Sequence, residues 1–256
     1  MIKTWYKEWF NNPEYLALYK HRNDTDAKKI ISLLFRNISP ERGAKCLDLA
    51  CGNGRHSVLF ARKGYYVTGL DLSPFLIVQA KKRLKKQYKA QREKLRFVIK
   101  DMRNIGYKNE FDLAVNLFSS FGYFEKKSEN FKVIKEVSAS LKNGGFFLFD
   151  FLNKDYIVHN LVPFDIKTLK GTAFIQIRQI SINGIVKNII IIKNRKNLKA
   201  PEVHQFLEKI QLYSLTEFRK EFKKRDLRIV KTFGNYSGEK YNKTGSERLI
   251  ILAQKV

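Results

Sequence analysis

A turn that contains two glycines holds the first residues that could do chemistry. It lies within the segment 45–57, KCLDLACGNGRHS. Gly52 and Gly54 let a ligand approach the backbone, and the helix that follows offers free N–H groups to a carboxylate or phosphate. The acid Asp48 suits a ligand that also carries a positive amino group. Ser57 stands where a dinucleotide-binding turn has its third glycine, which disfavours that class of ligand.

Two further acids follow the next two apolar runs of the chain. Asp71 closes the run that begins at Tyr66, and Asp101 follows the run Leu95–Ile99. An acid at the end of the second strand of a nucleotide-binding unit accepts hydrogen bonds from the two hydroxyls of a ribose. A carboxylate after the third strand is placed to accept one from an adenine amino group. These acids indicate a nucleoside ligand.

The elements that must position these residues alternate between strand and helix. Their apolar strands are continuous rather than alternating, which is typical of parallel strands buried between helices. The first half of the chain therefore predicts a doubly wound α/β sheet. The expected strands are 45–49, 66–70, 95–99, 111–116 and 146–151, and the expected helices are 25–37, 55–63, 74–91 and 130–141.

After Asn153 the pattern changes to antiparallel strands. The runs 172–181 and 185–194 flank Asn183-Gly184, a hairpin signal, and 202–212 is a third long strand. A helix at 216–225 and strands at 227–233 and 248–255 follow. We therefore expect one domain over residues 1–256, with a Rossmann-like, seven-stranded, mostly parallel sheet. A helical lid over about residues 1–24 and an antiparallel insertion after the fifth strand, about residues 155–213, complete it.

Composition narrows the class of protein. The chain has 256 residues, 44% of them hydrophobic, which excludes a disordered chain. Its apolar runs are too short to cross a bilayer, its N-terminus lacks a signal core, and Cys46 and Cys51 lack the partners of a metal site. We expect a cytoplasmic protein with reduced thiols, no metal and no membrane partner. The net charge of +26 fits either a nucleic-acid partner or a solvated basic surface.

Five segments, in this order and spacing, resemble the class I S-adenosylmethionine-dependent methyltransferases over about residues 40–155. They read LDLACGNGRHS, VTGLDLS, FVIKDMRNI, FDLAVNLFSSFGYF and LKNGGFFLFDFLN. The resemblance implies S-adenosyl-L-methionine as cofactor and S-adenosyl-L-homocysteine as product. By position, the resemblance implies that the methionine moiety is held by Asp48, Ala50, Gly52 and Gly54, and the ribose by Asp71. It implies that the adenine is contacted by Leu72, Asp101 and Met102. The residues next to both cofactor and acceptor would be Asn116, Leu117 and Phe118.

Three residues outside these segments are candidates for the same site. In similar methyltransferases a tyrosine of the N-terminal segment contacts the cofactor, which here implies Tyr19, with Arg22 near the carboxylate. The alternative is an N-terminal helix that only docks on the sheet. His56 opens the helix after the glycine turn, where a helix N-terminus disfavours its protonated form, so we expect a neutral hydrogen-bonding group.

The methyl acceptor is less constrained than the cofactor. The chain lacks the Asn/Asp-Pro-Pro-Tyr sequence of adenine or glutamine methylation and the Pro-Cys nucleophile of cytosine methylation. The segment 116–124 resembles small-molecule methyltransferases, including those of amino sugars. Some of these have a histidine where Tyr123 stands, so Tyr123 either orients the acceptor as a catalytic residue or only packs. We expect methylation of a small molecule at nitrogen or oxygen, with RNA as the less favoured acceptor and a non-catalytic cofactor-binding module as a further alternative.

Overall fold

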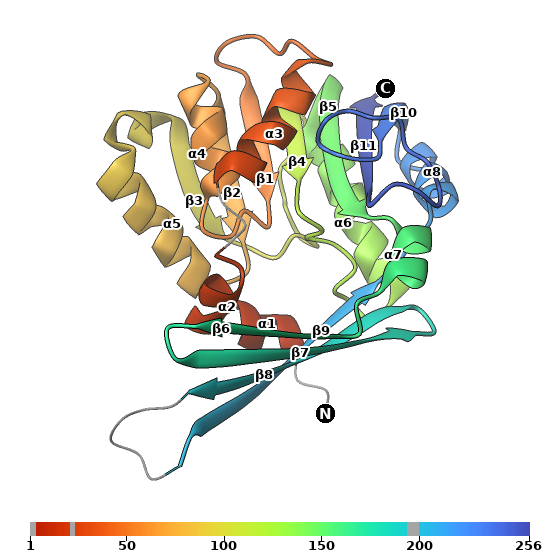
Figure 1. The fold of residues 1–256 in the computed structure, drawn as a ribbon. Helices are drawn as coiled ribbons and strands as arrows, with labels where there is room; N and C mark the ends of the chain where they lie inside the picture. Colours follow the sequence, from red (N-terminus) through yellow and green to blue (C-terminus); the bar gives the residue numbers. More distant parts are fainter. Residues whose placement is uncertain (1–3, 21–23, 194–199) are drawn as a thin grey trace.

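Parallel pairing of apolar strands builds the main sheet (Figure 1). The computed structural model describes residues 4–20, 24–193 and 200–256. The sheet has seven strands in the order β10-β11-β5-β4-β1-β2-β3, and only β11 runs antiparallel to its neighbours. The prediction of a doubly wound, mostly parallel sheet is therefore confirmed. The strands are β1 (Lys45–Leu49), β2 (Tyr66–Asp71), β3 (Leu95–Ile99), β4 (Phe111–Asn116), β5 (Leu141–Leu152), β10 (Leu227–Phe233) and β11 (Arg248–Lys255).

Helices cover both faces of this sheet, because each strand carries apolar side chains on both faces. On β5, Phe147, Phe149 and Phe151 enter one buried cluster, whereas Leu148 enters the other. One cluster includes side chains of α3 (Asp24–Phe35), α4 (Arg55–Arg62) and α5 (Pro74–Gln87), and the other those of α6 (Lys127–Ser140) and α8 (Leu215–Lys223). This two-sided burial places all the functional loops at the ends of the strands.

A second, antiparallel sheet lies below the main sheet in Figure 1, in the order β6-β7-β8-β9. Two short helices, α1 (Trp5–Phe10) and α2 (Pro13–Leu18), lie between the two sheets. The strands are β6 (Phe164–Leu169), β7 (Thr172–Ser181), β8 (Gly184–Lys193) and β9 (Glu202–Gln211), and the helix α7 (Lys154–Asn160) connects β5 to them.

Several predicted boundaries are wrong. The insertion has four strands and not three, because β6, a run of six residues that alternates between apolar and polar side chains over most of its length, also pairs with β7. Helix α7 was not expected. Strand β5 begins at Leu141, and the glycines expected to stop the preceding helix fall inside β5, where its register with β4 shifts. Helix α5 ends at Gln87, and a 3₁₀ helix, η1 (Lys89–Lys94), follows.

The two faces of the second sheet differ in their surroundings. The inner face, with Phe174, Ile189 and Ile191, is buried against the rest of the molecule. The register of the four strands places twelve other side chains in three rows on the opposite side, and none of them is buried. We call these twelve the outer face: Phe164, Ile166, Thr168, Ala173, Ile175, Ile177, Asn188, Ile190, Ile192, Val203, Gln205 and Leu207.

Across residues 4–20, 24–193 and 200–256, no helix combines the length and the apolar character that crossing a membrane requires.

Phe218 of α8 joins this helix to the sheet. Its side chain is fully buried and makes ring contacts with Phe121, Phe149, Phe151 and Phe222. The substitution Phe218→Ala should lower the free energy of unfolding by about 3–5 kcal/mol, because it removes buried area and leaves a cavity. Urea denaturation measures this, with Phe218→Leu as the milder control. A loss below about 0.5 kcal/mol for the alanine variant, as at a surface position, would contradict the packing described here.

Candidate functional site

A cleft with two compartments opens at the carboxyl ends of β1, β2 and β4, between the main sheet and α1 and α2. The first compartment lies against the carboxyl end of β2. Its lining includes Tyr6, Phe10, Asn11, Ala50, Gly52, Asp71, Leu72, Ser73, Asp101, Met102 and Tyr123. The second compartment is lined by Tyr19, Asp48, Ala50, Gly52, Arg55, His56, Leu117, Phe118, Tyr123, Glu208, Tyr236 and Arg248, among others. Ala50, Gly52 and Tyr123 belong to both, so the two compartments are continuous.

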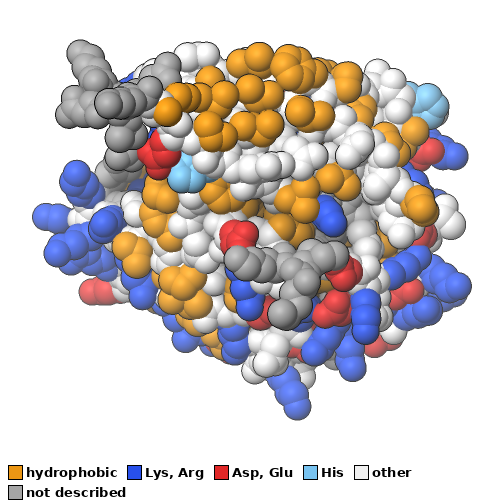
Figure 2. Space-filling view, turned by 90° about the horizontal axis from the view of Figure 1, so that it is seen from below, with side chains coloured by type: hydrophobic (Ala, Val, Ile, Leu, Met, Phe, Trp, Pro, Cys, Tyr) orange, Lys and Arg blue, Asp and Glu red, His pale blue; other side chains and the backbone are white. Residues whose placement is uncertain are grey.

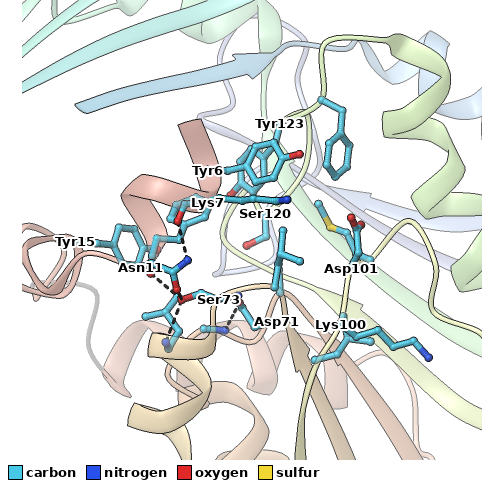
Figure 3. A pocket seen from close by; sticks show the side chains of 18 residues that line it. Tyr6, Lys7, Asn11, Tyr15, Asp71, Ser73, Lys100, Asp101, Ser120 and Tyr123 are labelled. Atoms are coloured by element: carbon cyan, nitrogen blue, oxygen red, sulfur yellow. Dashed lines mark hydrogen bonds between the residues drawn. The ribbon is translucent and has the colours of Figure 1, made fainter. Parts of the chain in front are cut away.

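Asp71 connects the glycine turn to the end of β2. Its Oδ2 accepts a hydrogen bond of 2.8 Å from the backbone N–H of Gly52, and its Oδ1 accepts one of 2.8 Å from the N–H of Ser73. Burial raises the pKa of Asp71, although these N–H donors oppose the rise. The hydroxyl of Ser73 then donates to Asn11 and to the carbonyl of Phe10, which attaches α1 to the same corner (Figure 3).

Asp101 lies across the first compartment from Asp71 (Figure 3). Its carboxylate forms an ion pair with Arg103, at 2.7 Å between Oδ2 and Nη2, and also accepts the backbone N–H of Arg103. Burial opposes ionisation, but the hydrogen bonds and charge of Arg103 prevail and hold the pKa of Asp101 below its usual value. Asp101 is therefore an ionised acceptor at the compartment wall. Arg103 reaches further to Glu129, at 2.7 Å, which fixes its guanidinium.

The glycine turn leaves room for a ligand at one glycine and not at the other. Gly52 has a φ of +57°, and a Cβ placed on it would meet no atom within 4 Å, so the wall beside it is open. Gly54 has a φ of +75°, and a Cβ there would lie 2.5 Å from the ring of Phe97. At Gly52 the backbone is therefore open to the cleft. Gly54 allows α4 to pack on β3.

Asp48 is almost completely buried at the base of the second compartment. Its Oδ2 accepts a hydrogen bond of 2.5 Å from the hydroxyl of Ser57. Burial raises the pKa of Asp48 to about 7, with Asp71 adding to the rise and Ser57 and Arg55 opposing it. A buried carboxylate with this pKa favours a cationic partner, because a positive charge nearby would stabilise its ionised form.

His56 lies beside Asp48 in the lining of the second compartment. Burial lowers the pKa of His56 well below its usual value, and Arg55 and Arg83 lower it further. Its Nε2 is buried and has no hydrogen-bond partner among the described residues. A buried polar atom without a partner costs free energy unless a ligand or water satisfies it. The lowered pKa agrees with the prediction that His56 is neutral.

A buried ion pair shapes the loop after β4. Phe118 and Ser119 have φ values of +58° and +63°, which are unfavourable for residues other than glycine. Asp150 of β5 holds this turn, since its Oδ2 accepts the N–H of Phe118 at 2.8 Å and its backbone carbonyl accepts that of Ser119 at 3.0 Å. Its Oδ1 accepts Nη2 of Arg248 at 2.6 Å, and the same Nη2 donates to the hydroxyl of Ser119.

Tyr236 completes this network from the loop between β10 and β11. Its hydroxyl donates to Asp150 at 2.9 Å, and its ring packs against that of Phe118. Burial and the Asp150 carboxylate raise the pKa of Tyr236, so its hydroxyl remains a donor. Sequence reasoning missed Asp150, Tyr236 and Arg248. The available signal was Asp150 itself, the single acid in the otherwise apolar run FFLFDFL.

Tyr123 and Asn116 have different positions in the site. Tyr123 lines both compartments, packs its ring against Trp5 and Phe10, and donates from its hydroxyl to the carbonyl of Ser119 at 3.2 Å. Asn116 is fully buried, and its amide donates to the carbonyls of Leu49 and Ser120. Asn116 therefore supports the loop that carries Leu117 and Phe118.

A buried polar cluster joins the N-terminal helices to the second sheet. Glu208 of β9 accepts hydrogen bonds from the indole of Trp9 at 2.6 Å and from the hydroxyl of Tyr19 at 2.7 Å. Lys187 of β8 forms an ion pair with Glu208 at 3.1 Å and also donates to the Tyr19 hydroxyl. Burial opposes ionisation of Glu208, but Lys187 and these donors hold its pKa below the usual value.

The structure gathers most of the predicted site residues around one cleft. Asp71, Leu72, Asp101 and Met102 line the first compartment, and Tyr19, Asp48, His56, Leu117 and Phe118 line the second. Gly54 and Asn116 do not line either compartment but support the segments that do. Arg22 lies outside the described residues. Within the described ranges, no group of three or more His, Cys, Asp or Glu side chains is arranged to hold a metal ion.

The Asp150 ion pair predicts a stability difference between a buried and an exposed acid. Asp150→Ala should lower the free energy of unfolding by about 3 kcal/mol, because it removes a fully buried acid and leaves the mostly buried Arg248 guanidinium without its ionic partner. The double variant with Arg248→Leu should recover part of this loss. The control is Asp112→Ala, which removes a partly exposed ion pair to Lys142 and a hydrogen bond from the backbone N–H of Lys45, and should cost about 1 kcal/mol. Equal losses in the two single variants, by urea denaturation, would contradict the assigned network.

Part of the chain is similar to known proteins. Residues 46–145 match the family described as "Methyltransferase domain". YqeM of Bacillus subtilis (strain 168), which has a provisional methyltransferase name, is 37% identical over 112 residues, 43% of each chain. The dTDP-3-amino-3,4,6-trideoxy-alpha-D-glucopyranose N,N-dimethyltransferase of Streptomyces venezuelae is 31% identical over 115 residues, 45% of each chain. The aligned region thus spans less than half the length of these relatives.

The fold likeness extends over nearly the whole chain. An S-adenosylmethionine-dependent methyltransferase from Clostridium acetobutylicum ATCC 824 superposes with a TM-score of 0.76 at 23% identity, covering 94% of this chain and 98% of the other. The matched domain includes the glycine turn, Asp71 and Asp101. Residues 46–145 therefore match a methyltransferase domain, and the whole chain shares its fold with an S-adenosylmethionine-dependent methyltransferase.

Proposed function

We propose that this chain transfers a methyl group from S-adenosylmethionine to a nitrogen or oxygen atom of a small-molecule acceptor, in the cytoplasm. The observation that carries the proposal is the continuous cleft, in which one compartment has the groups for an adenosine and the other has a buried acid beside the open wall at Gly52. The relative from Streptomyces venezuelae, named for the dimethylation of an amino sugar, favours nitrogen.

The first compartment supplies the contacts that an adenosine requires. In this proposal Asp71 accepts hydrogen bonds from the ribose hydroxyls while it holds the glycine turn. Asp101 accepts one from the adenine amino group, and Leu72 and Met102 contact the faces of the base. Both acids line the same compartment from opposite sides, which supports these roles.

The second compartment supplies contacts for an amino acid moiety and for the acceptor. Asp48 pairs with the amino group, and His56, with its unpartnered Nε2, is a neutral hydrogen-bonding group near the carboxylate. The bound cofactor supplies an electrophilic methyl group. Methyl transfer is an in-line displacement, so the chain contributes mainly alignment and exclusion of water. Tyr123, at the junction of the two compartments, is placed to orient the acceptor, and Glu208 and Ile210 of the second sheet line the space for it.

The first experiment is a calorimetric titration with S-adenosylhomocysteine, followed by a methyl-transfer screen of small amines, hydroxylated metabolites and total RNA. We expect binding with turnover on a small molecule. Asp71→Ala should weaken binding by about 1.5–3 kcal/mol, because it removes charge-assisted hydrogen bonds, while the off-site control Asp112→Ala should not. Absence of binding would overturn the cofactor assignment. Turnover on RNA alone would overturn the acceptor class, and binding without any turnover would favour a non-catalytic module.

The raised pKa of Asp48 predicts a pH dependence of cofactor binding. Below pH 7 the carboxyl is mostly protonated and loses its attraction for the amino group, and above pH 7 it is ionised. Affinity for S-adenosylhomocysteine should therefore rise about tenfold between pH 6 and pH 8. The matched variant Asp48→Asn should bind more weakly and show a flat profile over this range. A flat profile in the wild-type protein would contradict the pairing of Asp48 with the amino group.

A further inference from the structure

Among the residues that the structure describes, none covers the outer face of the second sheet. On its inner face Phe174, Ile189 and Ile191 are fully buried, whereas on the outer face Phe164, Ile166 and Ile177 are 54%, 54% and 41% exposed. In Figure 2, which views the molecule from the side of this sheet, hydrophobic side chains gather over an extended area in the upper part of the view. An antiparallel sheet with one solvated face normally alternates apolar and polar residues, so this sheet resembles the inner layer of a sandwich.

The outer face is unusual in its lack of charge. Nine of its twelve side chains are apolar, and the other three are Thr168, Asn188 and Gln205. The chain is 29% charged, so about three charged side chains would be expected among twelve positions. None is present, and all twelve belong to the described part of the chain. A surface of this kind, on a protein with a net charge of +26, is a site for association rather than for solvation.

The size of this face matches what a specific interface needs. Four strands about 4.8 Å apart and three to four rows about 6.8 Å apart give roughly 400–500 Å² on one copy. The fourth row, next to the three rows of the outer face, would include Val162, Gln179, Val186 and Lys209, so one lysine borders the outer face. Burying this area on two copies removes about 800–1,000 Å², and the upper figure, which needs the fourth row, reaches the lower limit for a biological interface.

We propose that the outer face is the interface of a homodimer, in which two copies of the second sheet pack face to face about a two-fold axis. Charge distinguishes this occupant from others. This protein has a net charge of +26, so a different protein would gain affinity by placing acidic groups against its lysines. The twelve side chains of the outer face include no charged group for such a partner to contact. Two copies of an uncharged apolar face pack on each other without bringing like charges together, and homodimer interfaces are the more apolar class.

The proposed contact leaves the cleft accessible. The outer face and the inner face belong to opposite sides of the same sheet, and Glu208 and Ile210, which line the second compartment, alternate along β9 with Leu207 of the outer face. Each copy would therefore keep its own cleft, with the sheet between the cleft and the partner. Dimerisation would also fix the position of the second sheet, whose inner face lines the proposed space for the acceptor.

Sedimentation of the full chain across a concentration range tests the proposal. We expect a species of twice the monomer mass of 30.1 kDa. Ile177→Lys places a charge on the outer face and should weaken the dimer at least about tenfold, because an unpaired charge is costly to bury. Val230→Lys is the matched control, since Val230 is 43% exposed on β10 of the main sheet, against 41% for Ile177. It should leave the dimer intact.

Each outcome decides the proposal. A monomeric wild-type protein at about 100 µM, well above typical dimer constants, would overturn it. So would a dimer that both lysine variants leave intact, or that both dissociate. A monomer that binds vesicles of phosphatidylserine through Ile177 would show that a lipid surface covers this face instead. Circular dichroism checks the fold of each variant, and if Ile177→Lys does not fold, Ile166→Lys at the more exposed neighbouring position replaces it.

Discussion

The carboxylate of Asp71 is the contact on which the cleft depends. It bonds the backbone of Gly52 on one side and of Ser73 on the other, and the hydroxyl of Ser73 bonds Asn11 and the carbonyl of Phe10. One buried acid thereby joins the ends of β1 and β2 to the N-terminal helices. A carboxylate can do this because it accepts several hydrogen bonds at once, whereas each backbone N–H offers only one.

The second compartment depends on another buried carboxylate, that of Asp150 on β5. Asp150 accepts bonds from Phe118, Tyr236 and Arg248, and so fixes a strained turn that the backbone alone would not adopt. Unfavourable φ values persist only where surrounding contacts determine them. The loop that carries Leu117 and Phe118 is therefore positioned by residues far from it in the sequence, from β5, β11 and the loop before β11.

The N-terminal helices and the second sheet behave as one wall of the cleft. Glu208 accepts bonds from Trp9 and Tyr19 and pairs with Lys187, so the side chains of two helical segments and two strands meet at one buried acid. Removing Lys187 would leave the carboxylate of Glu208 without its ionic partner. Residues of the N-terminal helices line the first compartment, and Glu208 and Ile210 of the second sheet line the second compartment.

The sequence by itself determined the main sheet and the two acids, Asp71 and Asp101, that line the first compartment. Continuous apolar strands have one stable solution, burial between helices, and the carboxyl ends of parallel strands then meet at one edge. Asp48, Gly52, Asp71 and Asp101 therefore come together whatever the rest of the chain does. Their individual ligand contacts, and the roles of Tyr19 and Tyr123, stay predictions.

Only the tertiary structure decided which glycine faces the ligand space, which acid holds the loop after β4, and what the second sheet exposes. Gly52 and Gly54 have the same local signal, and the ring of Phe97, distant in sequence, separates their roles. Asp150 acquires its partners only when β11 pairs with β5. The outer face arises because four strands in one register align their apolar side chains, and register is a property of pairs of strands, not of any single segment.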